Sequence, residues 1–237
     1  MNIDSVLHRY SVGGRDFHRI ELREAELINS ELCGADFSDA DLRQSRFGRT
    51  NFSYTCFRRA NLSETIFWGA DLTSADMRQA NLREADLSGA KLIQTQLTEA
   101  NLLKACLCGA NLSAVQMDGA ILIEVDLRPT SDQRTDLGRA NLAGADLSYA
   151  NLSQALLTQA NLDGAKLCRA TLKSDQWRDA FATDLSEASL CGADLSYVDL
   201  SGVNLRKANL RGADLTGTAL TYAELKDAIM PNGNVHS

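Results

Sequence analysis

The sequence repeats every five residues over most of its length. Every fifth position in the range 17–127 carries Leu, Phe or Met, without exception. The pattern resumes over 137–172 and, in a shifted frame, over 185–225. Two positions before each large residue stands a small one, usually Ala, and the residue between them is most often Asp or Asn. Because self-similarity at a fixed period marks a repeat architecture, this period constrains the fold more than composition does.

Neither regular secondary structure accommodates a period of five. On an α-helix, at about 100° per residue, the large side chains would spread around the whole surface. On a flat strand, an odd step would place successive large side chains on opposite faces. The chain must therefore turn a corner within every unit, so that small and large apolar side chains point toward one axis. Stacked coils of this kind bury one continuous core, which predicts an all-β parallel solenoid.

Units such as ANLRE, ADLSG and AKLIQ, over residues 80–94, resemble those of the pentapeptide-repeat proteins. The resemblance covers residues 17–225 and implies a right-handed quadrilateral parallel β-helix with four pentapeptides per turn. About forty units then give about ten coils, and a rod about 48 Å long at ~4.8 Å per coil. The sequence supports a twenty-residue turn through Phe17, Phe37 and Phe57, which predict a ladder of stacked rings in the core.

The extent of the repeat also predicts the domain organisation. We expect residues 1–16, with Val6, Leu7 and Tyr10, to form an N-terminal cap, because an open coil end exposes both core and unpaired backbone. Residues 17–225 are expected to form a single β-helix. Residues 226–237 should supply a C-terminal cap and a tail whose last residues fray.

Two interruptions break the repeat, near 128–136 and 173–184. In the first, Asp132 falls where an inward Leu is due, and Pro129 lacks the N–H that a ladder needs. We expect the chain to loop out here, although a degenerate coil side with its Asp turned away remains open. The second interruption shifts the frame by three and contains Trp177 and Phe181, which can fold back over the rod. Loops that interrupt a regular scaffold are candidates for function.

The outward positions suggest where a partner binds. With twenty residues per turn, Leu103 and Ile123 stack, and Ile121 lies on the same face. A contiguous apolar patch beside a loop predicts an interface, although drift of the repeat would also produce one. The candidate partner-binding residues are Leu103, Ile121, Ile123, Arg128, Pro129, Asp132, Arg134, Trp177 and Phe181.

The sequence offers little for chemistry. The three histidines lie near the termini with no motif around them, and the many Asp residues occupy a position that the repeat itself demands. We therefore expect no catalytic residues and no cofactor. Cys106 and Cys108 are the only close pair among six cysteines, and no second Cys pair or His cluster would complete a thiolate metal site. We accordingly expect no bound metal.

Charge and hydropathy restrict location and partners. A net charge of −7 argues against direct nucleic-acid binding, which requires a clustered basic surface. No stretch approaches the ~18 consecutive apolar residues of a membrane span. Neither end resembles a targeting signal, so we expect a cytoplasmic protein. The residues after Leu225 are too few and too polar for an apolar dimerisation module, which favours a monomer.

Three functions are compatible with such a rod. The sequence resembles most the members of the family linked to control of heterocyst differentiation in cyanobacteria. That resemblance implies a non-enzymatic regulatory module that binds a protein partner. The first alternative is the branch that binds DNA gyrase by mimicking DNA, but the outward column Glu26, Arg46, Ile66 is not a continuous acidic stripe. The second alternative is a structural spacer without a specific partner.

Overall fold

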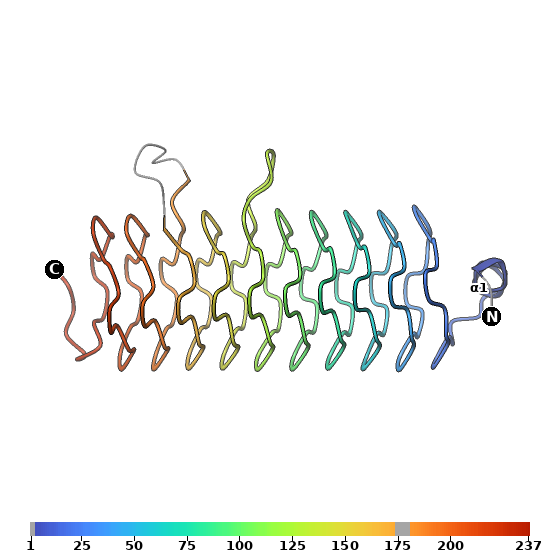
Figure 1. The fold of residues 1–237 in the computed structure, drawn as a ribbon, viewed down its shortest axis with the longest axis horizontal. Helices are drawn as coiled ribbons and strands as arrows, with labels where there is room; N and C mark the ends of the chain where they lie inside the picture. The colour runs from blue at the N-terminus through green and yellow to red at the C-terminus, as the bar shows by residue number, and fades with distance from the viewer. Residues whose placement is uncertain (1–2, 174–180) are drawn as a thin grey trace.

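The computed structural model, which describes residues 3–173 and 181–237, is a straight rod of stacked coils (Figure 1). Helix α1, Ile3–Ser11, lies across one end of the rod. Along the coils, the described backbone pairs through isolated parallel bridges instead of extended strands. Asp16 pairs with Asp36, for example, and Asp36 pairs with Cys56. Each coil therefore pairs with the next through one short backbone bridge on each face, and this pairing repeats along the rod.

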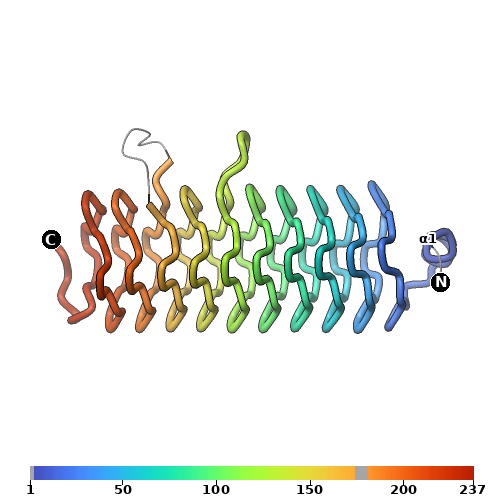
Figure 2. Tube along the Cα trace, in the orientation of Figure 1, coloured from blue at the N-terminus to red at the C-terminus, as the bar shows by residue number. Residues whose placement is uncertain are grey.

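The rod has four sides, because four bridge ladders run along it. The ladders begin at Asp16, Glu21, Glu26 and Glu31, and we name the corresponding faces A, B, C and D. Four pentapeptides thus complete one turn, as the sequence analysis expected, and Figure 2 shows the successive turns in register. Along face C, the ladder runs through Ile66, Asp86, Cys106 and Asp126, in the columns that the twenty-residue spacing predicted.

Each corner between faces is a tight turn. At the corner after face A, the N–H of Ile20 donates to the carbonyl of Phe17 at 3.1 Å, and Arg19 between them has φ 54°. The Asp or Asn that precedes each large residue holds the corner in place. Asp36 Oδ1, for instance, accepts the N–H of Ser38 at 2.8 Å. This bond confirms why the repeat favours a short carboxylate or amide at that position.

Inward side chains form one continuous apolar cluster along the rod. The predicted ring ladder is confirmed: Phe17 and Phe37 stack at 5.1 Å, and Phe37 and Phe57 at 5.5 Å. Phe52 meets its neighbours edge-on, including Phe47 at 5.2 Å. Beyond this aromatic segment the core consists mainly of Leu and Ala, nearly all of them fully buried. Burial of this continuous apolar column is the main force that holds the coils together.

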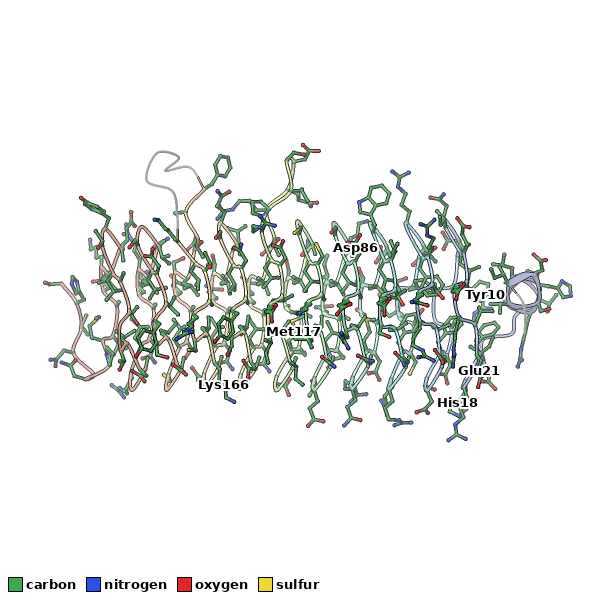
Figure 3. The ribbon with its side chains drawn as sticks, in the orientation of Figure 1. Tyr10, His18, Glu21, Asp86, Met117 and Lys166 are labelled. Atoms are coloured by element: carbon green, nitrogen blue, oxygen red, sulfur yellow. The ribbon has the colours of Figure 1, made fainter. Side chains whose placement is uncertain are left out.

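Helix α1 covers the N-terminal end of the core. Val6 is fully buried, and the hydroxyl of Tyr10 donates to the carbonyl of Cys33 at 2.9 Å. Tyr10 lies at the junction between the helix and the first coils (Figure 3). Leu7, grouped with these two in the sequence analysis, instead faces outward and is 37% exposed. Within the described part of the chain, no helix combines the length and the apolar character needed to cross a membrane.

The expectation that the C-terminal tail frays was wrong. Val235 forms an antiparallel bridge with Ile229, and the N–H of His236 donates to the carbonyl of Ala228 at 2.8 Å. The tail therefore turns back across the final coil. Its backbone groups satisfy an end that would otherwise present unpaired donors and acceptors.

Candidate functional site: the insertion edge

Both interruptions leave the rod at the same corner. Hydrogen-bonded residues on adjacent coils are normally 20 apart, but Gln116 and Asn141 are 25 apart and Gln159 and Glu187 are 28 apart. The interruptions therefore add five and eight residues to their coils. Each begins after face C and ends before face D, because the flanking bridges belong to those two faces. We call this corner, along the whole rod, the insertion edge, and Figure 1 shows the first insertion projecting from it.

A buried threonine closes each insertion at its base. The hydroxyl of Thr135 accepts the N–H of Gly109 at 2.8 Å and donates to the carbonyl of Arg128 at 2.9 Å. Thr183 does the same at the second insertion, with the N–H of Gln154 at 2.8 Å and the carbonyl of Leu172 at 2.7 Å. Both threonines are fully buried. The coil thus regains its register directly after an insertion of five residues and after one of eight.

Arg134 connects the two insertions. Its Nε donates to the carbonyl of Gln154 at 2.7 Å, and its Nη2 donates to the carbonyl of Ala182 at 2.6 Å. Burial lowers the pKa of this guanidinium, although the carboxylates of Asp184 and Asp136 act in the opposite direction. Arg134 was predicted to contact a partner, but its donors are turned to these internal carbonyls. Its clearest effect is to fix one insertion relative to the other.

A hollow of about 430 Å³ lies between the first insertion, Gln154 and Phe181. Phe181 lies at its border with 47% of its surface exposed, and Asp132 is exposed on the loop instead of buried in the core. The first segment therefore loops out, as expected. The hollow offers hydroxyl, amide and carboxyl groups beside one aromatic ring, which suits recognition of a peptide surface. It is lined by Pro129, Thr130, Ser131, Asp132, Gln133, Arg134, Gln154 and Phe181.

The remaining predicted residues do not join this hollow. Ile121 is 41% exposed on face B, and Leu103 and Ile123 are half-buried at the corner between faces B and C. The bridge ladder of face C separates this patch from the insertion edge. Trp177 lies outside the described residues. The structure thus brings Pro129, Asp132, Arg134 and Phe181 together, and it leaves the apolar patch apart.

Arg128 starts the first insertion and binds Asp126. Its Nη2 donates to Asp126 Oδ2 at 2.7 Å, and its Nε donates to Oδ1 at 2.9 Å. Burial alone would raise the pKa of Asp126, but the hydrogen bonds and charge of Arg128 hold it below its usual range. The pair orients the first residue of the loop at the surface of the rod.

A second hollow, of about 340 Å³, lies further along the same edge. Trp68 is 46% exposed and Ile28 is 43% exposed, with Gly48 between them in the same column. The guanidinium of Arg49 lies 4.5 Å from the centre of the Trp68 ring. Sequence reasoning did not select these residues or Gln154. The signal in the sequence was the outward column spaced by twenty residues that contains Ile28, Gly48 and Trp68. This column continues to Arg128, where the first insertion begins.

The fold and the sequence place the chain in a known family. The model for pentapeptide repeats matches residues 16–53, 55–92, 75–113, 90–128, 135–173, 183–221 and 199–234. The chain therefore belongs to the pentapeptide-repeat family, and the expected right-handed β-helix is confirmed. The matched ranges leave out residues 129–134 and 174–182, which lie within the two insertions.

Among solved structures, the chain is similar to HetL of the cyanobacterium Nostoc sp. strain PCC 7120. HetL is a pentapeptide repeat protein involved in heterocyst differentiation regulation. The two share 58% sequence identity over 100% of both chains, with a TM-score of 0.98. The resemblance to heterocyst-linked members of the family is thereby confirmed.

Two other solved structures are more distant. The plasmid-mediated fluoroquinolone resistance protein QnrB1 is 16% identical, with a TM-score of 0.34 over 84% of this chain and 90% of its own. A thylakoid-lumen pentapeptide repeat protein of Arabidopsis thaliana is 26% identical, with a TM-score of 0.32 over 54% of this chain and 68% of its own. None of the curated proteins matches the chain.

Proposed function

We propose that this protein regulates heterocyst differentiation by binding a protein partner at the insertion edge, without catalysing a reaction. The observation that carries the proposal is the similarity to HetL over the full length of both chains. That alignment spans both insertions as well as the coils. The sequence that this chain shares with HetL, for which a regulatory role is named, therefore includes the insertion edge.

The geometry supports the insertion edge as the contact surface. Phe181 and Trp68 are large exposed aromatics on one edge of a stiff scaffold, and aromatic side chains are enriched among residues that dominate binding energy. Arg134 and the closing threonines fix the bases of the insertions before a partner arrives, which reduces the ordering cost of association. We take the rod of about ten coils to act as a cytoplasmic monomer in this role.

Affinity capture from Nostoc extract tests the proposal. HetL and this protein serve as parallel baits, and retained proteins are identified by mass spectrometry. We expect both baits to retain the same protein, and we expect Phe181→Ala to reduce its retention at least tenfold. Tyr54→Ala is the matched control, because Tyr54 is an aromatic residue, 68% exposed, at the corner between faces D and A.

Expression of the same variants in Nostoc links binding to function. Heterocyst frequency should change with the unaltered protein and with Tyr54→Ala, but not with Phe181→Ala. Different proteins on the two baits, or equal loss in both variants, would contradict the proposal. If DNA gyrase is the protein retained by both baits, the function would instead be gyrase binding by mimicry of DNA.

A further inference from the structure

A pair of thiols lies on face C, one coil before the first insertion. Cys106 and Cys108 flank the inward Leu107, so both side chains point away from the core. Their Sγ atoms are 3.3 Å apart, well beyond the ~2.05 Å of a disulfide. Both residues are half-buried. Two adjacent, partly shielded sulfur atoms are donors that soft metal ions prefer.

The fold adds a third donor that is distant in sequence. Asp126 pairs with Cys106 across the ladder of face C, and one ligand atom from each of Cys106, Cys108 and Asp126 lies within 4.8 Å of the others. The hydroxyl of Ser88, from the preceding coil, is 3.1 Å from Cys106 Sγ. The sequence predicts no metal site, because it contains no second Cys pair or His cluster. The carboxylate of Asp126 becomes a third donor only through the stacking of neighbouring coils.

The repeat itself places Cys106 beside other donors. This residue occupies the position of the usual Asp or Asn, in the bridge ladder of face C. Its Sγ lies 3.3 Å from Cys108 Sγ and 3.1 Å from the hydroxyl of Ser88. Cys56 stands at the same repeat position, but Arg58 takes the place of a second thiol two residues further on.

We propose that Cys106, Cys108 and Asp126 form a binding site for a thiophilic d¹⁰ cation, with Zn²⁺ as the ion to test. Tetrahedral Zn²⁺ with ~2.3 Å bonds to sulfur holds two thiolates about 3.8 Å apart, so small side-chain rotations would suffice. Binding displaces the protons of both thiols to the solvent, as metal ligation by cysteine requires. Three protein ligands leave a fourth position for water or for an outside donor.

Arg128 gives the site a distinctive feature. It donates to both oxygens of Asp126, so it competes with a metal for that carboxylate. Arg128 also begins the first insertion, and its carbonyl accepts the hydroxyl of Thr135. Metal binding and the orientation of the Arg128 side chain are therefore linked at the base of the loop. A metal held adventitiously by scattered surface thiols would not depend on this arginine.

Titration of the reduced, full-length protein with Co²⁺, followed by displacement with Zn²⁺, tests the site. We expect thiolate-to-cobalt charge-transfer absorption that saturates at about one ion per chain. Cys106→Ser and Cys108→Ser should each abolish it, and Asp126→Asn should weaken Zn²⁺ binding at least tenfold. Arg128→Gln should tighten binding several-fold by freeing the carboxylate. Circular dichroism on each variant verifies that the coils are retained.

Cys56→Ser is the matched control and should leave the titration unchanged. Absence of charge-transfer absorption at micromolar protein and equimolar Co²⁺ would overturn the proposal. A band that survives in Cys108→Ser would do so too, because a single thiol would then be responsible. Unchanged affinity in both Asp126→Asn and Arg128→Gln would remove Asp126 from the site.

Discussion

Residues 17–127 and residues 128–225 follow the same five-residue repeat, but two insertions interrupt the repeat in the second segment. In the first segment the ladder is unbroken, the core contains stacked Phe rings, and Arg–Asp pairs link neighbouring coils on the surface. In the second, two insertions leave one corner, and the core is built mainly of Leu and Ala. The coils keep their register in both segments. Register therefore depends on inward side chains and corner hydrogen bonds, and the two loops are accommodated because a buried threonine closes the base of each.

The largest expected effect is on the aromatic core of the first segment. Phe52 contacts four other Phe rings and is 1% exposed. Phe52→Ala should cost about 3–5 kcal/mol of unfolding free energy, because it removes the ring and leaves a cavity. Leu157→Ala in the second segment should cost about 2–4 kcal/mol. Urea denaturation followed by circular dichroism gives both values. A smaller loss for Phe52→Ala than for Leu157→Ala would break the contrast between the two cores.

The next effect concerns the closure of the insertions. Thr135→Val should cost about 2–3 kcal/mol, because it removes the acceptor of the buried Gly109 N–H as well as a donor. Thr183→Val should cost a similar amount. Thr95→Val is the control, since the Thr95 hydroxyl only donates to the carbonyl of Leu72, and it should cost about 1 kcal/mol. Equal losses in all three variants would show that the closing threonines have no special role.

A pair of glycines isolates how the first insertion packs on the rod. Both Gly109 and Gly89 have positive φ, 65° and 62°. A Cβ on Gly109 would lie 2.8 Å from the Thr130 side chain, but one on Gly89 would meet nothing within 4 Å. Gly89→Ala should cost about 1 kcal/mol through its backbone alone, and Gly109→Ala about 1 kcal/mol more. Thermal denaturation measures the difference, and limited proteolysis should find the loop of Gly109→Ala more readily cleaved. Equal melting temperatures would mean that the loop does not rest on the coil.

The smallest effect is the acid sensitivity of the first segment's surface. Hydrogen bonds from Arg78, and then from Arg58, lower the pKa of Asp76 well below its ordinary value of 3.8, against the opposing effect of burial. The folded state therefore gains stability above that value, and the gain is lost as pH falls below it. Partial exposure of the pair limits the effect to under about 1 kcal/mol. Asp76→Asn should reduce stability at pH 7, and by clearly less at pH 2, where part of the gain is already lost. An equal difference at pH 7 and pH 2 would assign it to packing.

The sequence predicted the coil well and the site only in part. Leu and Ala at fixed spacing determine which side chains point inward, so the faces, the Phe ladder and the outward columns could be derived. Asp132 signalled the first loop because a carboxylate could not occupy the core. The contact of Arg134 with Ala182 could not be derived, since it requires that both insertions leave the same corner. Asp126 was missed beside Cys106 for a related reason: the repeat already explained its presence.

Removal of the first insertion tests most directly whether the insertion edge binds the protein partner and the coils serve only as its scaffold. Deletion of Pro129–Gln133 joins Arg128 to Arg134 and restores the repeat spacing between Leu127 and Leu137. The measurement is the affinity, by isothermal titration calorimetry, for the protein captured by both HetL and the intact chain. We expect coils that melt within a few degrees of the unaltered protein and an affinity at least tenfold weaker. Unchanged affinity on an intact rod would contradict this account and assign binding to one of the regular faces.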